Sequence, residues 1–258
     1  MTYLAIIPAR GGSKSIPRKN LALVAGKPLI AWSIQVALES QRLSRVIVST
    51  DDEEIAEVAQ EWGAEVPFRR PPELARDDTP GIDPIIHAVT WLEQHENDTP
   101  DYVVVLQPTS PLRTTQDIDA AVQLAQEKQV DSVVSVCPIH HHPYWTKRIT
   151  DDGRLVPFLE LEQDYYRRQT LPPVYALNGA IYLVQRTILL KQQSFYTEQT
   201  FAYVMPPERS IDVDTSWDLH LVNLVLEDRN ACESHPHRHP PRRPRPSLLH
   251  HCRGRGQP

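Results

Sequence analysis

Continuous apolar runs, separated by amphipathic segments, constrain this chain more than any other feature of its sequence. Four runs long enough for buried strands lie at residues 3–8, 45–50, 101–107 and 131–136. The segments between them place apolar side chains three and four residues apart, which is the spacing of one helix face. Strands that are apolar on both faces and alternate with helices are typical of a parallel sheet covered on both sides. The sequence therefore predicts an α/β fold whose ligands bind beyond the carboxyl ends of the strands.

Residues 138–176 interrupt this alternation. The segment is rich in tyrosine, proline and charge, and it is too long for a simple strand connection. We expect an inserted, hairpin-like arm that projects from the sheet. The α/β pattern resumes afterwards, so the predicted domain consists of residues 1–137 and 177–230. The arm also contributes aromatic side chains that would otherwise be exposed, namely Tyr144, Trp145, Phe158, Tyr165 and Tyr166.

The last 28 residues, 231–258, have a different composition. They contain six prolines, six arginines and five histidines, and they have no apolar periodicity. Such a segment cannot build a hydrophobic core. We therefore interpret residues 231–258 as a disordered or non-native basic tail, with a metal-binding or nucleic-acid-binding tail as the alternative.

The overall composition argues against several classes of protein. The net charge of the whole chain is −6. Residues 231–258 carry about +5, so the first 230 residues carry about −11. A body this acidic argues against a broad nucleic-acid-binding surface. No apolar run approaches the 18 residues of a membrane span, and the first strand begins at once without a signal-peptide pattern. Because the three cysteines make no disulfide framework, we expect a cytoplasmic protein.

A basic loop follows the first strand, in the stretch "IIPARGGSKSIPRKN". Gly11 and Gly12 would let successive backbone N–H groups point inward, and nearby cations would neutralise phosphate charge. The loop matches neither the P-loop pattern nor the dinucleotide fingerprint. Nucleotide binding by a longer cationic loop around a triphosphate is the interpretation that remains, against an exposed basic turn with no special role. The cations are Arg10, Lys14, Arg18 and Lys19.

A pair of carboxylates lies in the stretch "SIDVDTSWDL". Asp212 and Asp214 alternate with apolar residues, so in an extended chain both side chains point the same way. Two such carboxylates are a natural site for Mg²⁺, which keeps phosphate oxygens as further ligands. The alternative is a helix cap, with Thr215 capping the last helix and the aspartates favouring its N-terminus. The D-x-D-x-T pattern of aspartyl phosphatases is a third option, but it normally follows the first strand.

Two further stretches differ in what they indicate. His140, His141 and His142 are consecutive and lack a partner cysteine pair, so solvated or interface histidines are favoured over a zinc site. The stretch "LQPTSPLR" follows the third apolar run, and its two prolines fix a chain rich in hydrogen-bonding side chains. Its position at a strand end favours a ligand-binding loop over a plain turn.

Six blocks of this chain, in order, resemble the CMP-sialic acid synthetases, also called acylneuraminate cytidylyltransferases. The blocks are "ARGGSKSIPRKN", "RPPELARD", "LQPTSPLRT", "SVVSVCPIHHHP", "LNGAIYL" and "SIDVDTSWDL", and the resemblance covers roughly residues 1–229. It implies a Rossmann-like nucleotidyltransferase fold that transfers CMP from CTP to a nonulosonic acid and releases pyrophosphate. N-acetylneuraminic acid is the favoured acid, with legionaminic or pseudaminic acid as alternatives. A catalytically silent nucleotide-sugar-binding protein is the alternative from another class.

The resemblance also implies roles for individual residues. It places the triphosphate of the nucleotide in a cradle of cations, in which Arg10, Lys14 and Lys19 contribute to catalysis. It also implies Mg²⁺, or Mn²⁺ in its place, bound by the two aspartates. The implied nucleotide-binding residues are Arg10, Gly11, Gly12, Ser13, Lys14, Lys19, Asn20 and Arg70, and the implied metal ligands are Asp212 and Asp214.

On the sugar side, the resemblance implies contacts from Gln107, Arg168 and Asn178, with Gln107 also at the reacting phosphate. It further implies a homodimer through residues 138–176, with the arm approaching the neighbouring sugar site. Trp145 stands where the family pattern has a basic residue, and Lys147 or Arg148 would have to substitute for it.

Overall fold

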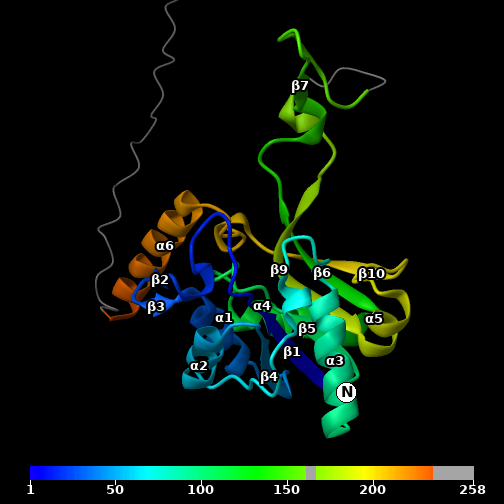
Figure 1. Cartoon of the computed structure of the whole chain (residues 1–258). Helices are drawn as coiled ribbons and strands as arrows, with labels where there is room; N and C mark the ends of the chain where they lie inside the picture. The colour runs from blue at the N-terminus through cyan, green and yellow to red at the C-terminus, as the bar shows by residue number, and fades with distance from the viewer. Residues whose placement is uncertain (161–166, 235–258) are drawn as a thin grey trace, which may run out of the picture.

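The fold is built around one mainly parallel sheet. The computed structural model describes residues 1–160 and 167–234. Within these residues the main sheet has the strand order β10-β6-β9-β5-β1-β4 (Figure 1). Strand β1 pairs in parallel with β4 and β5, and β10 pairs in parallel with β6. The bounds are β1 Tyr3–Pro8, β4 Arg45–Ser49, β5 Tyr102–Val105, β6 Ser132–Pro138, β9 Tyr175–Gln185 and β10 Thr200–Val204.

Helices cover both faces of this sheet, as the apolar runs predicted. In β1 the side chains of Ala5 and Ile7 pack on α1, α2 and α4, whereas Leu4 and Ile6 pack on α3 and α5. All four are fully buried, because successive strand residues point to opposite faces and both faces are covered. The helices are α1 Leu29–Leu38, α2 Glu53–Glu61, α3 Asp83–Glu96, α4 Thr115–Lys128, α5 Arg186–Gln192 and α6 Ser216–Ser234.

Helix α6 belongs to a third, smaller core. Its Val222 and Leu226 pack with Val24 of the short hairpin formed by β2 (Leu23–Val24) and β3 (Lys27–Pro28). Val213, between the two predicted metal ligands, is buried in the same cluster. None of the helices in the described parts of the chain is long and apolar enough to cross a membrane.

Strand β9 runs against its neighbours, which the alternation of runs and helices did not predict. It pairs antiparallel with both β5 and β6. The reason is its connection: the chain leaves β6 at the carboxyl end, passes through the arm, and returns at that same end. A direct return of this kind can only produce an antiparallel strand.

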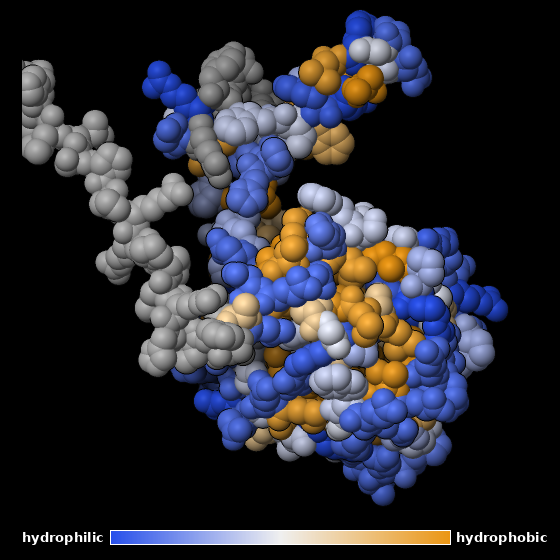
Figure 2. All heavy atoms as spheres, turned by 90° about the vertical axis from the view of Figure 1, so that its left-hand side faces the viewer, coloured by the Kyte–Doolittle hydropathy of each residue, from blue (hydrophilic) through white to orange (hydrophobic). Residues whose placement is uncertain are grey.

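The described parts of the arm, residues 138–160 and 167–176, project away from the sheet (Figures 1 and 2). The stalk is a continuation of β6 and β9, in which Val136 pairs with Leu177 and Pro138 with Tyr175. Farther out, β7 (Lys147–Ile149) and β8 (Leu155–Pro157) form an antiparallel hairpin. Tyr165 and Tyr166, two of the five aromatic residues singled out in the arm, lie outside the described residues.

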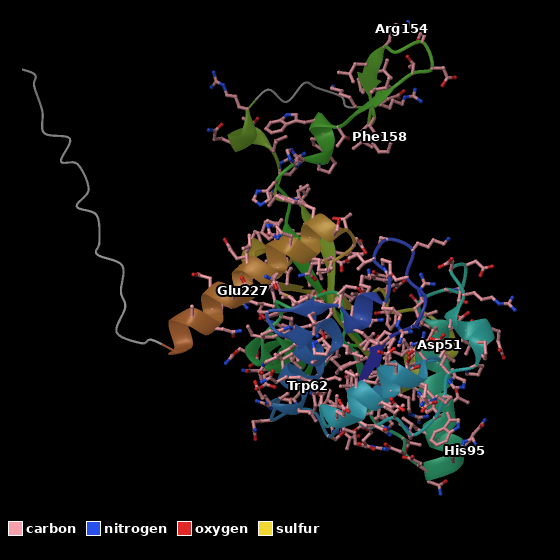
Figure 3. The ribbon with its side chains drawn as sticks, turned by 60° about the vertical axis from the view of Figure 1, so that its left-hand side comes forward. Asp51, Trp62, His95, Arg154, Phe158 and Glu227 are labelled. Atoms are coloured by element: carbon pink, nitrogen blue, oxygen red, sulfur yellow. The ribbon has the colours of Figure 1, made fainter. Side chains whose placement is uncertain are left out.

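The far part of the arm carries exposed apolar side chains. Phe158 is 65% exposed, and both it and Arg154 lie far from Asp51 of the α/β domain (Figure 3). Ile149 and Leu155 of the hairpin are also exposed. In the stalk, His142 is buried: its Nε2 lies 3.1 Å from the Pro172 carbonyl oxygen, and its Nδ1 accepts a hydrogen bond from the Tyr144 N–H.

Candidate active site

A cavity of about 480 Å³ opens at the carboxyl ends of β1 and β5. Four segments contribute to its wall: the basic loop, the segment between α2 and α3, the "LQPTSPLR" loop and the segment before α6. The sheet therefore brings together residues that lie up to about 200 positions apart in the sequence. Predicted site residues that line the cavity are Arg10, Gly12, Ser13, Lys14, Lys19, Asn20, Arg70, Gln107, Asp212 and Asp214.

The basic loop is held in place by its own polar contacts. Asn20 is buried, and its Nδ2 donates to the Arg10 carbonyl oxygen at 2.9 Å, which ties the two ends of the loop together. The Gly11 N–H donates to Asp51 Oδ1 at 3.1 Å. A Cβ atom on Gly11 would lie 2.6 Å from Asp52 Oδ2, so only glycine fits there. Gly11 thus serves the packing of the loop and does not itself line the cavity.

Arg18 differs from the other cations of the loop. It has left-handed backbone angles, with φ of 53°, and forms ion pairs with Asp52 and Glu54 at the start of α2. The Arg18 guanidinium is therefore paired with carboxylates outside the cavity, and Arg18 does not line the cavity.

Arg70 places a buried positive charge in the cavity wall. Its side chain donates to the Ser49 hydroxyl and carbonyl, and the residue is only 4% exposed. Burial lowers the pKa of Arg70 to about 10, with Asp51 acting in the opposite direction and Arg10 adding to the decrease. The guanidinium is still charged at neutral pH, so this side of the cavity favours an anion.

Arg10 and Lys14 share one carboxylate. Arg10 NH1 and Lys14 Nζ each lie 2.8 Å from a different oxygen of Asp77. The two cations lower the pKa of Asp77, Lys14 more strongly than Arg10. Asp77 belongs to the "RPPELARD" block, and its contact across the cavity mouth was not apparent from the sequence.

The two aspartates before α6 alternate with a buried residue, as predicted. The Val213 N–H donates to the Thr109 carbonyl at 2.8 Å, which leaves Asp212 and Asp214 facing the cavity. Asp212 Oδ1 is buried and has no hydrogen-bond partner among the described residues. Burial raises the pKa of Asp212, and repulsion from Asp214 adds to this, while Thr109 and Lys19 act in the opposite direction. A buried, unpartnered carboxylate oxygen beside a second carboxylate fits a divalent cation.

The helix cap uses other atoms. Asp218 Oδ2 accepts from the backbone N–H and the hydroxyl of Thr215, and the Thr215 hydroxyl accepts from the Asp218 N–H. This reciprocal arrangement is a capping box. Thr215 therefore caps α6 as the alternative stated, but the side chains of Asp212 and Asp214 take no part in the capping box and remain available for a ligand. Lys19 Nζ donates to the Val213 carbonyl at 2.9 Å and lies 3.4 Å from Asp214.

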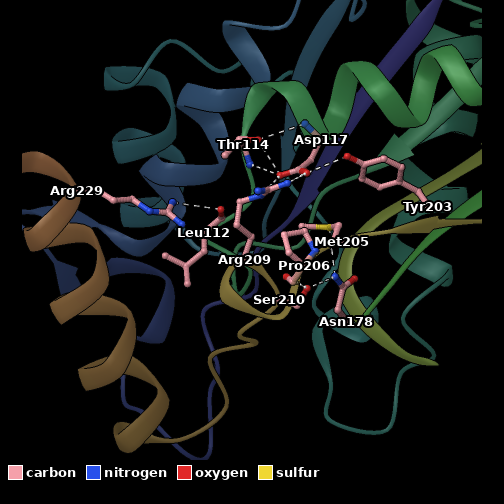
Figure 4. A network of polar contacts seen from close by, with 10 residues as sticks. All are labelled: Leu112, Thr114, Asp117, Asn178, Tyr203, Met205, Pro206, Arg209, Ser210 and Arg229. Atoms are coloured by element: carbon pink, nitrogen blue, oxygen red, sulfur yellow. Dashed lines mark hydrogen bonds and ion pairs between the residues drawn. The ribbon is translucent and has the colours of Figure 1, made fainter. Parts of the chain in front are cut away.

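The loop that carries these aspartates is anchored beside α4. Arg209 makes two hydrogen bonds to Asp117, of 2.7 and 3.0 Å, and the Tyr203 hydroxyl makes a third of 3.0 Å (Figure 4). Burial opposes ionisation of Asp117, but hydrogen bonds from Arg209, Thr114 and Tyr203 outweigh it and hold the pKa below its ordinary value. The ionised Asp117 therefore anchors Arg209, which lies three residues before Asp212 in the sequence.

Gln107 and Asp212 both lie against a bulge in β9. Between the pairs Val134–Tyr182 and Val136–Leu177 the register shifts, so residues 178–181 of β9 lie opposite Ser135 alone. Gly179, in this bulge, has φ of +70°, and a Cβ there would lie 2.6 Å from Gln107 Oε1 and 3.6 Å from Asp212 Oδ2. The bulge and its glycine thus leave room for the side chains of Gln107 and Asp212, which both face Gly179.

Asn178 and Ser135 stabilise the bulge. The Ser135 hydroxyl accepts from the Ile181 N–H at 2.7 Å and donates to Asn178 Oδ1 at 2.6 Å. The Asn178 amide donates to Ser210 Oγ at 3.0 Å (Figure 4). Asn178 is 4% exposed and does not line the cavity. The structure therefore places it beneath the site, and the side chain of Arg168 is outside what the structure describes.

Arg113 supports the same region from below. Its guanidinium is fully buried and donates to the carbonyl oxygens of Gln107, at 3.3 Å, and Ala180, at 2.6 Å. A third hydrogen bond, of 2.7 Å, reaches the Ser33 hydroxyl. Burial lowers the pKa of Arg113 to about 9. Arg113 therefore fixes the backbone on both sides of the Gln107 amide without facing the cavity.

A second cavity of about 370 Å³ adjoins the first. The two share Pro8, Gly81 and Gln107, so Gln107 lies at their boundary. Aromatic residues distinguish the second cavity, and sequence reasoning did not identify them. Tyr182 lies on an otherwise apolar strand, which was the one available signal, whereas Phe195 and Tyr196 follow α5 without a pattern. The remaining lining residues are Ile82, Val105, Gln193 and Ser194.

A family profile described as Cytidylyltransferase matches residues 4–231. The chain belongs to the cytidylyltransferase family. Among its relatives, the CMP-N,N'-diacetyllegionaminic acid synthase of Legionella pneumophila is 40% identical over 229 residues, which cover 88% of this chain and 97% of that protein. The N-acylneuraminate cytidylyltransferase of Streptococcus agalactiae is 36% identical over 231 residues, covering 88% of this chain and 54% of that one. The pseudaminic acid cytidylyltransferase of Campylobacter jejuni is 32% identical and is covered to 97%.

Solved structures agree with this cytidylyltransferase fold. The CMP:2-keto-3-deoxy-manno-octonic acid synthetase complexed with CTP superposes with a TM-score of 0.66 at 19% identity, covering 89% of this chain and 100% of that one. The 4-diphosphocytidyl-2C-methyl-D-erythritol synthase from Anaerococcus prevotii superposes with a TM-score of 0.61 at 12% identity. The predicted nucleotidyltransferase fold and the resemblance to the CMP-sialic acid synthetases are both confirmed.

Proposed function

We propose that this cytidylyltransferase transfers CMP from CTP to the anomeric hydroxyl of a nonulosonic acid and releases pyrophosphate. The observation that carries the proposal is the combination, in one cavity, of a cationic loop and the unpartnered Asp212 carboxylate. The cations suit a triphosphate, and the carboxylates suit the cation that accompanies it. Relatives named for neuraminic, legionaminic and pseudaminic acids support the substrate class.

In this proposal the chain acts mainly by positioning and electrostatics. Arg10, Lys14 and Lys19 hold the β- and γ-phosphates, so that the charge of the departing pyrophosphate is matched by fixed cations. Arg70, charged and buried, adds to the same field. The Gln107 amide, at the boundary of the two cavities, orients the reacting phosphate against the attacking hydroxyl. The sugar hydroxyl attacks the α-phosphorus, and the bond between the α- and β-phosphates breaks.

The metal requirement is also a proposal. Asp212 and Asp214 would hold Mg²⁺, or Mn²⁺, with the remaining positions left to phosphate oxygens and water. Such an ion would supply Lewis-acid polarisation of phosphate oxygens and lower the pKa of a bound hydroxyl. Lys19 contacts Asp214 and the Val213 carbonyl, so a cation of the proposed phosphate cradle lies directly beside one of the two proposed metal ligands.

The acid is proposed to occupy the second cavity, next to Gln107, where aromatic side chains offer an apolar wall. N-acetylneuraminic acid was favoured from the sequence, and the 40% identity to a CMP-legionaminic acid synthase makes legionaminic acid an equal candidate. Direct sugar contacts from Arg168 and Asn178 stay predictions from the resemblance.

The proposed assembly is a homodimer through residues 138–176, in the cytoplasm. The exposed apolar side chains on the arm, Phe158 among them, support a partner surface. A two-fold dimer would bury both copies of this surface at once.

A pyrophosphate-release assay tests the proposed reaction. The protein is incubated with CTP and Mg²⁺, and with N-acetylneuraminic, legionaminic or pseudaminic acid in separate reactions. The expected result is acid-dependent pyrophosphate release together with the matching CMP-sugar in the mass spectrum, and the Asp212→Asn variant serves as the inactive control. Binding of CTP without turnover on any of the three acids would favour the silent binding protein instead.

A further inference from the structure

The cation pair of the phosphate cradle already has an anion. Asp77 offers one carboxylate oxygen to Arg10 and the other to Lys14, each at 2.8 Å. All three residues line the same cavity. The protein's own carboxylate therefore offsets part of the positive charge that a triphosphate would meet in this cavity.

The position of Asp77 is fixed by the loop that carries it. The short helix Pro72–Ala75 precedes Asp77, and the Thr79 hydroxyl donates to the Glu73 carbonyl at 3.0 Å. This hydrogen bond folds the loop back on itself with Asp77 at the turn. The carboxylate thereby links the segment between α2 and α3 to the basic loop after β1.

We propose that Asp77 is an internal competitor of the substrate's phosphates, which sets how tightly CTP and pyrophosphate bind. This inference rests on the proposed function, because it takes Arg10 and Lys14 as the phosphate-binding cations. A phosphate group that reaches them must displace the carboxylate or share the cations with it. Either course weakens polyanion binding, and the weakening applies to the product pyrophosphate as well as to CTP. Asp77 therefore favours release of pyrophosphate and limits occupation of the cradle by small anions.

The exposure of the three side chains limits the size of the effect. Asp77 is 48% exposed and Lys14 is 78% exposed, so solvent screens both ion pairs. Two exposed pairs of this kind correspond to an affinity change of about three- to tenfold. The change should shrink at high salt, because exposed charges are screened within about 8 Å at physiological ionic strength.

Calorimetric titration of the whole protein tests the inference by binding rather than turnover. Pyrophosphate, Mg²⁺–CTP and uncharged cytidine are titrated into wild type and Asp77→Asn. The expected result is about three- to tenfold tighter binding of pyrophosphate and CTP by the variant, with cytidine unchanged and the gain reduced at 0.5 M salt. Asp78→Asn is the matched control: Asp78 is the next residue, forms no ion pair within the described residues and does not line the cavity. It should bind all three like wild type.

The outcomes are distinguishable. Wild type that binds CTP while Asp77→Asn binds pyrophosphate no more tightly overturns the competitor role and leaves the proposed function standing. Weaker Mg²⁺–CTP binding by the variant also overturns it, because the carboxylate would then serve the substrate. Wild type that binds neither CTP nor pyrophosphate overturns the proposed function and this inference with it. Asp77→Ala, which removes hydrogen bonding as well as charge, should tighten pyrophosphate binding to a similar extent.

Discussion

Replacing Ser135 by alanine should destabilise the β9 bulge that supports the active site, and should lower both Tm and kcat. The Ser135 hydroxyl fills the gap left by the β9 bulge, where it accepts from the Ile181 N–H and donates to Asn178. Ser135 is 1% exposed, so water cannot replace the hydroxyl without rearrangement. In the variant the Ile181 N–H loses its partner, while Asn178 Oδ1 keeps only the longer bond of 3.3 Å from the Ala180 N–H.

The size of the effect follows from these two bonds. A buried group left without a partner costs about 1–3 kcal/mol, so the loss in the free energy of unfolding should be about 3 kcal/mol. For a domain of this size that corresponds to a decrease in Tm of about 6–12 °C. Because the bulge carries Gly179 beside Gln107, a relaxed bulge should also lower kcat by at least about tenfold.

Thermal unfolding by circular dichroism, with steady-state kinetics well below Tm, measures both quantities. Ser40→Ala is the control, since the Ser40 hydroxyl is also buried and donates to Asp119, away from the bulge and from both cavities. It should cost about 1 kcal/mol and leave kcat unchanged. If Ser135→Ala keeps the Tm and kcat of wild type, the bulge is not held by this hydroxyl and the reasoning fails.

The remaining predictions concern the metal site, the arm and the tail. Asp212→Ala or Asp214→Ala should lower kcat by at least about 10²-fold and leave the circular dichroism spectrum intact, because the capping box of α6 uses other residues; near-normal kcat in both at saturating Mg²⁺ would contradict the metal role. Replacing Trp145 and Phe158 by serine should weaken the dimer in sedimentation and raise KM for the acid more than for CTP, and a monomer with a normal KM for the acid would separate the two properties. The predicted tail began at residue 231, but α6 continues to Ser234, so the deletion that tests the tail starts at residue 235. Deleting residues 235–258, which have no periodic apolar face, should change neither Tm nor kcat, and a decrease in either on the purified truncated protein would count against a disordered tail.

The parts of the fold that follow from local pattern could be predicted from the sequence. In β1 every side chain from Tyr3 to Ile7 is apolar, and the structure buries them all on two covered faces. The alternation of Asp212, Val213 and Asp214 likewise gave the correct orientation, with Val213 buried and the carboxylates toward the cavity. Such features depend on the two-residue period of an extended chain, which is visible in any short window of sequence.

Features that depend on contacts between residues far apart in the sequence could not be predicted from local sequence patterns. The direction of β9 follows from how the arm returns to the sheet, and the register shift at residues 178–181 depends on its pairing with β6. Asn178 was assigned to the sugar from a motif, whereas its hydrogen bonds to Ser135 and Ser210 place it under the bulge. The contact of Asp77 with Arg10 joins residues 67 positions apart, and no local pattern reports it.

Strand β9 belongs both to the base of the arm and to the main sheet. It runs from Tyr175 at the base of the arm, through the bulge, to Gln185 beside the first residue of β5, and Gly179 lies only four residues, roughly 13 Å, from its outer end. An insertion or deletion of one residue between Tyr175 and Asn178 would turn every following side chain to the opposite face or force the bulge to move. Arms from other proteins could therefore be exchanged into this scaffold only at junctions that preserve the count of residues up to Gly179.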